Sequence, residues 1–188
     1  KDLSPEEYLV MTDDIITLLR RNGFRVESRD KENTKLKAFR RNIYFPELLF
    51  EFGLTGHREE RFLIKIEAQD QMFEYTPVLA NIRLNGFFFP FPVPPDSILC
   101  SMKLSAMLDR QKGRDFYDIM FLLPRTIPDY LFLTSKHSIS GPDDLKNAVD
   151  RILKNVNLKV KSRDFEHLLF NRDNSLRILR VPEFFKEQ

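Results

Sequence analysis

Residues 102–118, with the sequence MKLSAMLDRQKGRDFYD, guide the interpretation of the whole chain because they set charged side chains into an apolar helical pattern. On a helix with about 100° per residue, Leu99, Ala106 and Met107 fall within roughly 60° of Lys103. Lys103 therefore lies in the middle of the face that a helix buries. A buried ammonium without a partner costs several kcal/mol, so we expect Lys103 to face an anion or a polar cleft.

The second half of this stretch predicts a corner between two helices. Gly113 is expected to end the first helix in a left-handed cap, because glycine adopts that conformation most easily. Arg110 lies on the same face as Lys103, and Asp115 and Asp118 are three residues apart on one face of the second helix. Two cations and two carboxylates are therefore expected to converge at the corner. The alternative is an exposed helical hairpin whose surface ion pairs contribute little stability.

The spacing Lys103-x2-Ala106-x3-Arg110-x-Lys112-x-Arg114-Asp115-x2-Asp118 resembles a signature of the AbiEii/AbiGii-type nucleotidyltransferases. These are toxin components of bacterial abortive-infection and toxin-antitoxin systems. The resemblance implies an α+β fold in which residues 1–95 form a nucleotidyltransferase-like mixed sheet with flanking helices and residues 96–188 form a helical part. It also implies NTP as substrate, Mg2+ as cofactor, an acceptor such as tRNA, and a cognate antitoxin as partner.

The resemblance assigns expected roles to the charged residues of the corner. Lys103 resembles the lysine that engages the nucleotide phosphates, and Arg110 and Arg114 would add cationic contacts to the triphosphate or the acceptor. Asp115 and Asp118 resemble the acidic pair of the signature, which positions the cations or acts in transfer. A purely structural role for Lys103 is a further alternative. In that case Lys103 pairs with Asp118 inside the core, and removing the lysine side chain would unfold the protein.

Glu67 is the expected metal ligand in the first half of the chain. Residues 41–54 and 61–71 are β-prone runs joined by the polar loop 55–60, which predicts an antiparallel hairpin. Glu67 shares the half-polar face of the second strand with Leu63 and Lys65. It either faces solvent or, as the resemblance implies, supplies the third carboxylate of a metal site.

The acidic pair that the family uses to hold two divalent cations is missing from this sequence. No Asp-x-Asp occurs, and neither does the Gly-Ser or Gly-Gly that would precede it. Such acids activate the attacking oxygen and neutralise the triphosphate through the metals. We expect that the chain begins just after these residues and is inactive alone, with a degenerate copy as the alternative. Whether the chain acts as an enzyme is therefore left open.

A basic run in the second half suggests a different function. Between residues 145 and 163 six basic residues stand against Asp150 alone, although the net charge of the chain is only +2. Such a run is typical of a solvated helix face. The alternative is an inactive fold that binds RNA or an antitoxin through Arg151, Lys154, Lys159 and Lys161.

Composition limits the other possibilities. The single cysteine, Cys100, excludes an internal disulfide, and no apolar run of 18 residues occurs, so we expect a cytoplasmic protein without a membrane span. The three histidines are far apart and show no zinc-binding spacing. Further secondary structure is expected as a helix from Ser4 to Asn22, a polar turn over 29–34, a strand over 77–89, an extended connector over 90–95, a helix capped by Asp96 or Ser97, and helices near 128–136, 140–153, 161–170 and 174–186.

Overall fold

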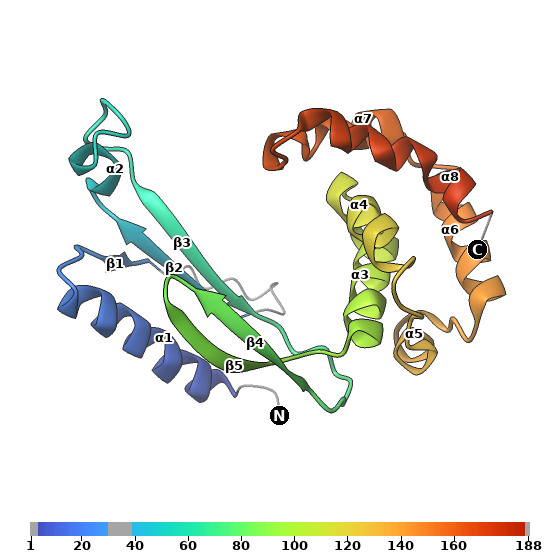
Figure 1. Ribbon diagram of the computed structural model, residues 1–188, viewed down its shortest axis with the longest axis horizontal. Coiled ribbons are helices and arrows are strands. Elements are labelled where there is room, and N and C mark those ends of the chain that lie inside the picture. The colour runs from blue at the N-terminus through green and yellow to red at the C-terminus, as the bar shows by residue number, and fades with distance from the viewer. Residues whose placement is uncertain (1–3, 30–38, 187–188) are drawn as a thin grey trace. The chain divides into compact units, whose positions relative to one another are not determined.

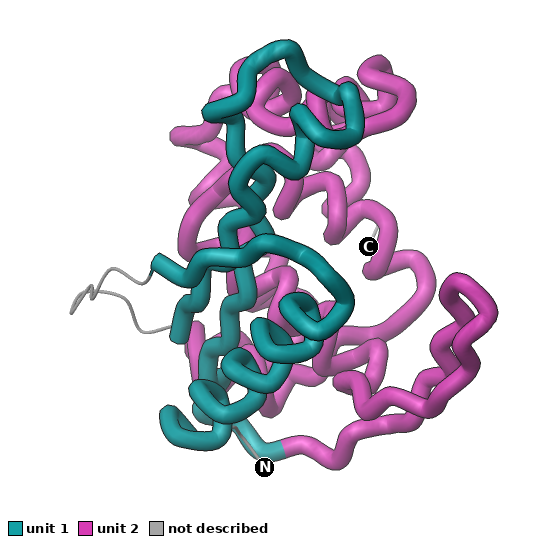
Figure 2. Tube along the Cα trace, turned by 90° about the vertical axis from the view of Figure 1, so that its left-hand side faces the viewer, with its two compact units in different colours: residues 1–74 teal, residues 75–188 magenta. Residues whose placement is uncertain are grey.

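The computed structural model describes residues 4–29 and 39–186 of the chain (Figure 1). Most of the turn predicted over 29–34 lies outside these residues. Contacts divide the chain into two compact units, residues 1–74 and 75–188 (Figure 2). The functional division predicted after residue 95 stays a prediction.

The first unit begins with helix α1 (Pro5–Arg21), whose start is encoded locally. The Glu7 amide donates to the Ser4 hydroxyl over 3.1 Å, and the Ser4 amide donates to the Glu7 carboxylate over 2.8 Å. This reciprocal capping satisfies two amides that a helix start would otherwise leave unpaired. The helix start expected at Ser4 is therefore confirmed.

Helix α1 covers a three-stranded antiparallel sheet with the order β1-β2-β3. The strands are β1 (Glu27–Ser28), β2 (Phe39–Phe45) and β3 (Phe62–Ala68), and the short helix α2 (Leu48–Glu51) lies between β2 and β3. Ile16 of α1 and Ile43 of β2 belong to the buried core of this unit, and Ile66 of β3 packs against it. The antiparallel pairing expected between the two β-prone runs is confirmed, but residues 48–51 of the first run form helix α2 instead of strand. The alternation in β3 sends Glu67 to the face opposite Ile66.

The second unit begins with a hairpin of β4 (Val78–Leu84) and β5 (Phe87–Val93). Asn85 and Gly86 both have positive φ, 49° and 83°, as a two-residue type I′ turn requires. The sequence interpretation expected one strand over 77–89 and a connector over 90–95, and both expectations are wrong in part. The turn at Asn85 and Gly86 divides the first range into two strands, and residues 90–93 belong to β5. Pro90 and Pro92 lie within β5, where proline is tolerated because β5 is an edge strand.

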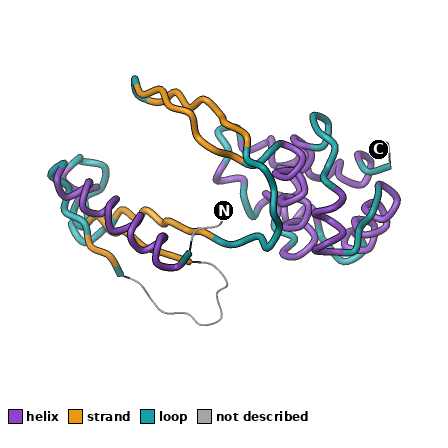
Figure 3. The backbone as a smooth tube through the Cα atoms, turned by 90° about the horizontal axis from the view of Figure 1, so that it is seen from below, coloured by secondary structure: helices purple, strands orange, loops and turns teal. Residues whose placement is uncertain are grey.

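The rest of the second unit is helical, and Figure 3 shows these helices gathered in one body. The elements are α3 (Asp96–Arg110), α4 (Gly113–Leu122), α5 (Tyr130–His137), α6 (Pro142–Leu153), α7 (Leu158–Arg163), η1 (Glu166–Leu168), η2 (Arg172–Arg180) and α8 (Val181–Phe184). Leu104, Phe116 and Phe132 are among the fully buried side chains that join α3, α4 and α5. The expected α+β class is confirmed. Neither Asp96 nor Ser97 caps α3, since Pro95 holds that position without a side-chain bond.

None of the helices in the described ranges combines the length and the apolar character that crossing a bilayer requires.

Candidate functional site

The corner between α3 and α4 is formed by a residue other than the predicted one. Gln111 follows the last residue of α3 in the left-handed conformation, with φ 51° and ψ 40°, and its amide donates to the Met107 carbonyl over 3.2 Å. Gly113 is instead the first residue of α4. The prediction that Gly113 caps the first helix is therefore wrong, although a left-handed residue does end that helix.

Gly113 is needed for close packing. A Cβ atom built at this position would lie 1.9 Å from the Lys161 carbonyl oxygen and 2.7 Å from a ring carbon of Phe165. Real Cβ atoms do not approach other heavy atoms this closely. The absence of a side chain at Gly113 lets α7 lie directly against the start of α4.

Asp115 is fully buried and clamps the two helices together. Arg110 donates to both of its carboxylate oxygens, from Nε to Oδ2 over 2.9 Å and from Nη2 to Oδ1 over 2.7 Å. The Lys112 amide adds a third bond to Oδ2 over 3.2 Å. Hydrogen bonding to this carboxylate raises the pKa of the Arg110 guanidinium above its usual value. The buried carboxylate, near the start of α4, also complements the positive end of the helix dipole.

Lys103 and Asp118 form the second pair of the corner. The Lys103 ammonium donates to Asp118 Oδ2 over 2.6 Å, and the two side chains are 37% and 34% exposed. Lys103 thus meets an anion, as expected, but it lies at the border of the apolar face rather than within it. The expected convergence of two cations and two carboxylates is confirmed, whereas the catalytic and binding roles assigned to these residues stay predictions.

Arg114 completes the corner, and its side chain is exposed although its neighbours Gly113 and Asp115 are buried. Within residues 4–29 and 39–186 its guanidinium takes part in no hydrogen bond or ion pair. It differs in this from Arg110, whose donors are committed to Asp115. Arg114 is therefore the arginine of the corner that is open to a ligand.

Glu67 lies in the first unit, half-exposed on β3, and forms an ion pair with Arg40 directly opposite on β2. Over the described ranges, no three histidine, cysteine, aspartate or glutamate side chains gather where they could share a metal ion. Glu67 with its arginine partner therefore does not make up a magnesium site by itself.

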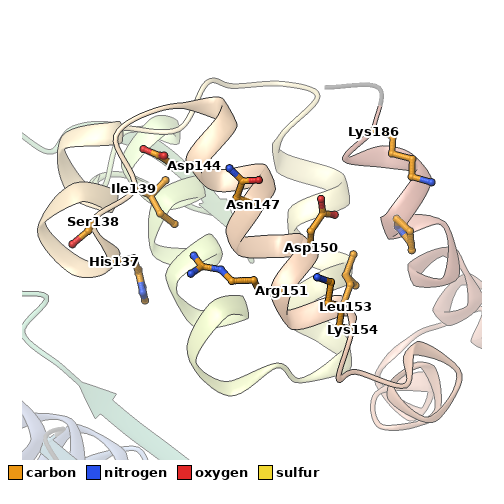
Figure 4. Close-up of a pocket in the computed structure, with 11 residues that line it drawn as sticks. His137, Ser138, Ile139, Asp144, Asn147, Asp150, Arg151, Leu153, Lys154 and Lys186 are labelled. Carbon is orange, nitrogen blue, oxygen red and sulfur yellow. The ribbon is translucent and has the colours of Figure 1, made fainter.

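Two residues of the predicted RNA-binding set line an open groove of about 850 Å3 along α6. Figure 4 shows Arg151 and Lys154 there with His137, Asp150 and Lys186. The other two, Lys159 and Lys161, belong to α7 and do not line the groove.

His137 is half-buried at the end of α5. Its Nε2 lies 2.7 Å from the Ser105 hydroxyl and 4.0 Å from Asp109 Oδ2. Both partners meet the same ring nitrogen, so the group is not arranged as a catalytic triad, in which the carboxylate binds the other nitrogen. Ser105 and His137 are 32 residues apart, and no local pattern could have linked them.

Comparison with known proteins gives one family. The family described as "Nucleotidyl transferase AbiEii toxin, Type IV TA system" matches residues 10–132 of the chain. The match covers more than half of the 188 residues and contains Glu67 and the whole α3–α4 corner. No curated protein and no solved structure matches significantly.

Proposed function

Because the chain belongs to the AbiEii nucleotidyl transferase toxin family of type IV toxin-antitoxin systems, we propose that its α3–α4 corner binds the triphosphate of an NTP. The bound NTP would donate a nucleotide to an acceptor, and we propose that this acceptor is tRNA. We further propose a bacterial, cytoplasmic setting in which a cognate antitoxin restrains the protein.

The observation that carries the proposal is the partly exposed Lys103–Asp118 pair. Its ammonium is held by one carboxylate at a position that solvent reaches, so a phosphate can replace Asp118 without burying a new charge. Arg114, exposed and without a partner in the described part of the chain, supplies a second cation for the same ligand.

Arg110 has a different part in this proposal from the one that the resemblance implies. Its guanidinium already donates to both oxygens of Asp115, and taking it away would leave a buried carboxylate unpaired. Arg110 and Asp115 therefore act as positioning residues that fix the angle between α3 and α4. Lys103 and Arg114 make the contacts with phosphate.

Enzymes of this kind generally use divalent metals, and we propose Mg2+ with Glu67 as one carboxylate ligand. Glu67 would first have to release Arg40. Since the sequence holds no Asp-x-Asp pair, we expect the 188-residue chain to bind NTP without transferring nucleotides by itself.

NTP binding by the 188-residue protein tests the proposal, with isothermal titration calorimetry as the measurement. Lys103→Ala removes a charge-assisted contact worth about 1.5–3 kcal/mol, so binding should weaken by about 10- to 150-fold. Lys159→Ala removes the same charge from an exposed position on α7, in the same unit, and should leave the affinity within about twofold. The proposal fails if no NTP binds, or if both variants lose affinity equally while remaining folded.

A second candidate function is a catalytically inactive module that binds RNA or an antitoxin. Its support is that Arg151, Lys154 and Lys159 are exposed and engage no carboxylate within the described part of the chain. For single-stranded RNA, the slope of log affinity against log salt should become shallower by about 0.7 for every cation that no longer meets a phosphate. Combined Lys154→Glu and Lys159→Glu should thus flatten the slope in fluorescence anisotropy. Loss of RNA binding through Lys103→Ala alone would instead favour the corner.

A further inference from the structure

The two edges of the β4–β5 hairpin differ in their ability to pair with another strand. Pro90 and Pro92 lie opposite Asn81 and Leu79. Proline has no N–H, so both prolines occupy the pairs that exchange no hydrogen bonds across the hairpin, and their nitrogens face the outer edge of β5. Among the β5 residues whose backbone nitrogen points away from β4, Phe88 alone has an N–H group that can donate a hydrogen bond. The outer edge of β5 is closed to strand addition.

The outer edge of β4 is open. The same alternation directs the N–H and C=O groups of Leu79, Asn81 and Arg83 away from β5. In the part of the chain that the structure describes, β4 pairs with β5 alone. All three residues are exposed. Their three N–H and three C=O groups would be satisfied by a partner strand that supplies three acceptors and three donors.

A second β4 strand meets these requirements. When two copies run antiparallel with Asn81 opposite Asn81, Leu79 of each copy lies opposite Arg83 of the other. Every outward N–H and C=O group is then used. No two like charges are opposed, because Arg83 is the only charged residue of either strand.

The same register brings apolar side chains of the two copies together. Val78 and Leu84, which are 49% and 64% exposed, become direct cross-strand neighbours, and so do Ala80 and Ile82. Pairs of this kind stabilise a sheet by about 0.2–1 kcal/mol each. The resulting four-stranded sheet has the order β5-β4-β4-β5, with prolines on both outer edges. It therefore stops at two copies.

We propose that the protein self-associates through the outer edge of β4, with a two-fold axis at Asn81, to form this proline-bounded sheet. The proposal is independent of nucleotide binding. It assigns the β4 edge to a second copy of this chain, and it assigns Pro90 and Pro92 the role of ending the sheet.

Disulfide trapping tests the register. In the proposed sheet the two Asn81 Cα atoms are about 5.5 Å apart, within the range that a disulfide spans, so Asn81→Cys should give a covalent dimer under mild oxidation. Arg83→Cys is the matched control. Its two sulfur-bearing residues would be offset by four positions, roughly 13 Å, and should not crosslink. Equal crosslinking of both variants, or none of Asn81→Cys, overturns the register.

Light scattering during gel filtration tests whether the protein forms a dimer through the outer edge of β4. The protein should move from 22.4 kDa toward twice that mass as concentration rises. Asn81→Pro removes an outward donor and should keep the protein monomeric, whereas Asn81→Ser keeps the N–H and should not. Dimers that survive Asn81→Pro but are lost with Phe89→Asp would show that the apolar face, not the edge, is the interface. A wild-type protein that stays monomeric at every concentration would also refute the proposal.

Discussion

Replacing Asp115 with alanine tests whether the α3–α4 corner is a buried clamp or a surface ion pair. The side chain is fully buried and accepts three hydrogen bonds, two of them from Arg110. Breaking a buried pair costs about 3–5 kcal/mol. The Arg110 side chain is 44% exposed and can be hydrated once its partner is removed. We therefore expect Asp115→Ala to lower the free energy of unfolding by about 3 kcal/mol, near the lower end of this range.

The two members of the pair should behave unequally. Arg110→Ala leaves the Asp115 carboxylate buried with only the Lys112 amide, so it should cost more than Asp115→Ala, about 4–5 kcal/mol. Asp115→Asn keeps the size of the side chain and an oxygen that accepts from Lys112, and it should fall between wild type and alanine. Urea unfolding followed by circular dichroism gives the three free energies. Values for Asp115→Ala within about 0.5 kcal/mol of wild type would refute the clamp.

Three further predictions concern neighbouring features. Lys103→Ala should remain folded and lose at most about 1 kcal/mol in thermal unfolding, because the pair is partly exposed; an unfolded variant would support a purely structural Lys103. Gly113→Ala should cost at least about 2 kcal/mol in urea unfolding, since its methyl group meets the Lys161 carbonyl, and a neutral result would mean that α7 moves freely. Burial raises the pKa of the Cys100 thiol to about 11, so the native thiol should react with a disulfide reagent at pH 8 far more slowly than the unfolded one. The raised value contributes stability that is present below the unfolded thiol pKa of about 9 and is lost as pH rises through about 11.

Local chemistry explains the parts of the structure that the sequence predicts well. The start of α1 depends on Ser4 and Glu7, three residues apart. The corner pairs join residues separated by five positions, Arg110 and Asp115, or by fifteen, Lys103 and Asp118, on two adjacent helices. Helical periodicity is enough to place such groups together.

Contacts between distant segments explain what the sequence did not predict. The packing reason for Gly113 is Lys161, which lies in another helix, and nothing near Gly113 indicates it. The Asn85-Gly86 pair is typical of a two-residue hairpin turn. The prolines that follow it disfavour a strand, and for this reason the second strand of the hairpin was not predicted. Glu67 faces Arg40 because of strand register, which alternation alone does not define.

The contact between Gly113 and Lys161 also bears on how this protein can vary. On the α7 side it includes a main-chain oxygen, which every amino acid carries, so the side chain at position 161 can change without altering that oxygen. The cations of α7 can thus be replaced while the Lys103 corner keeps its geometry. The two proposed functions, nucleotide binding at the corner and polyanion binding on the basic helices, are therefore expected to vary independently among related sequences.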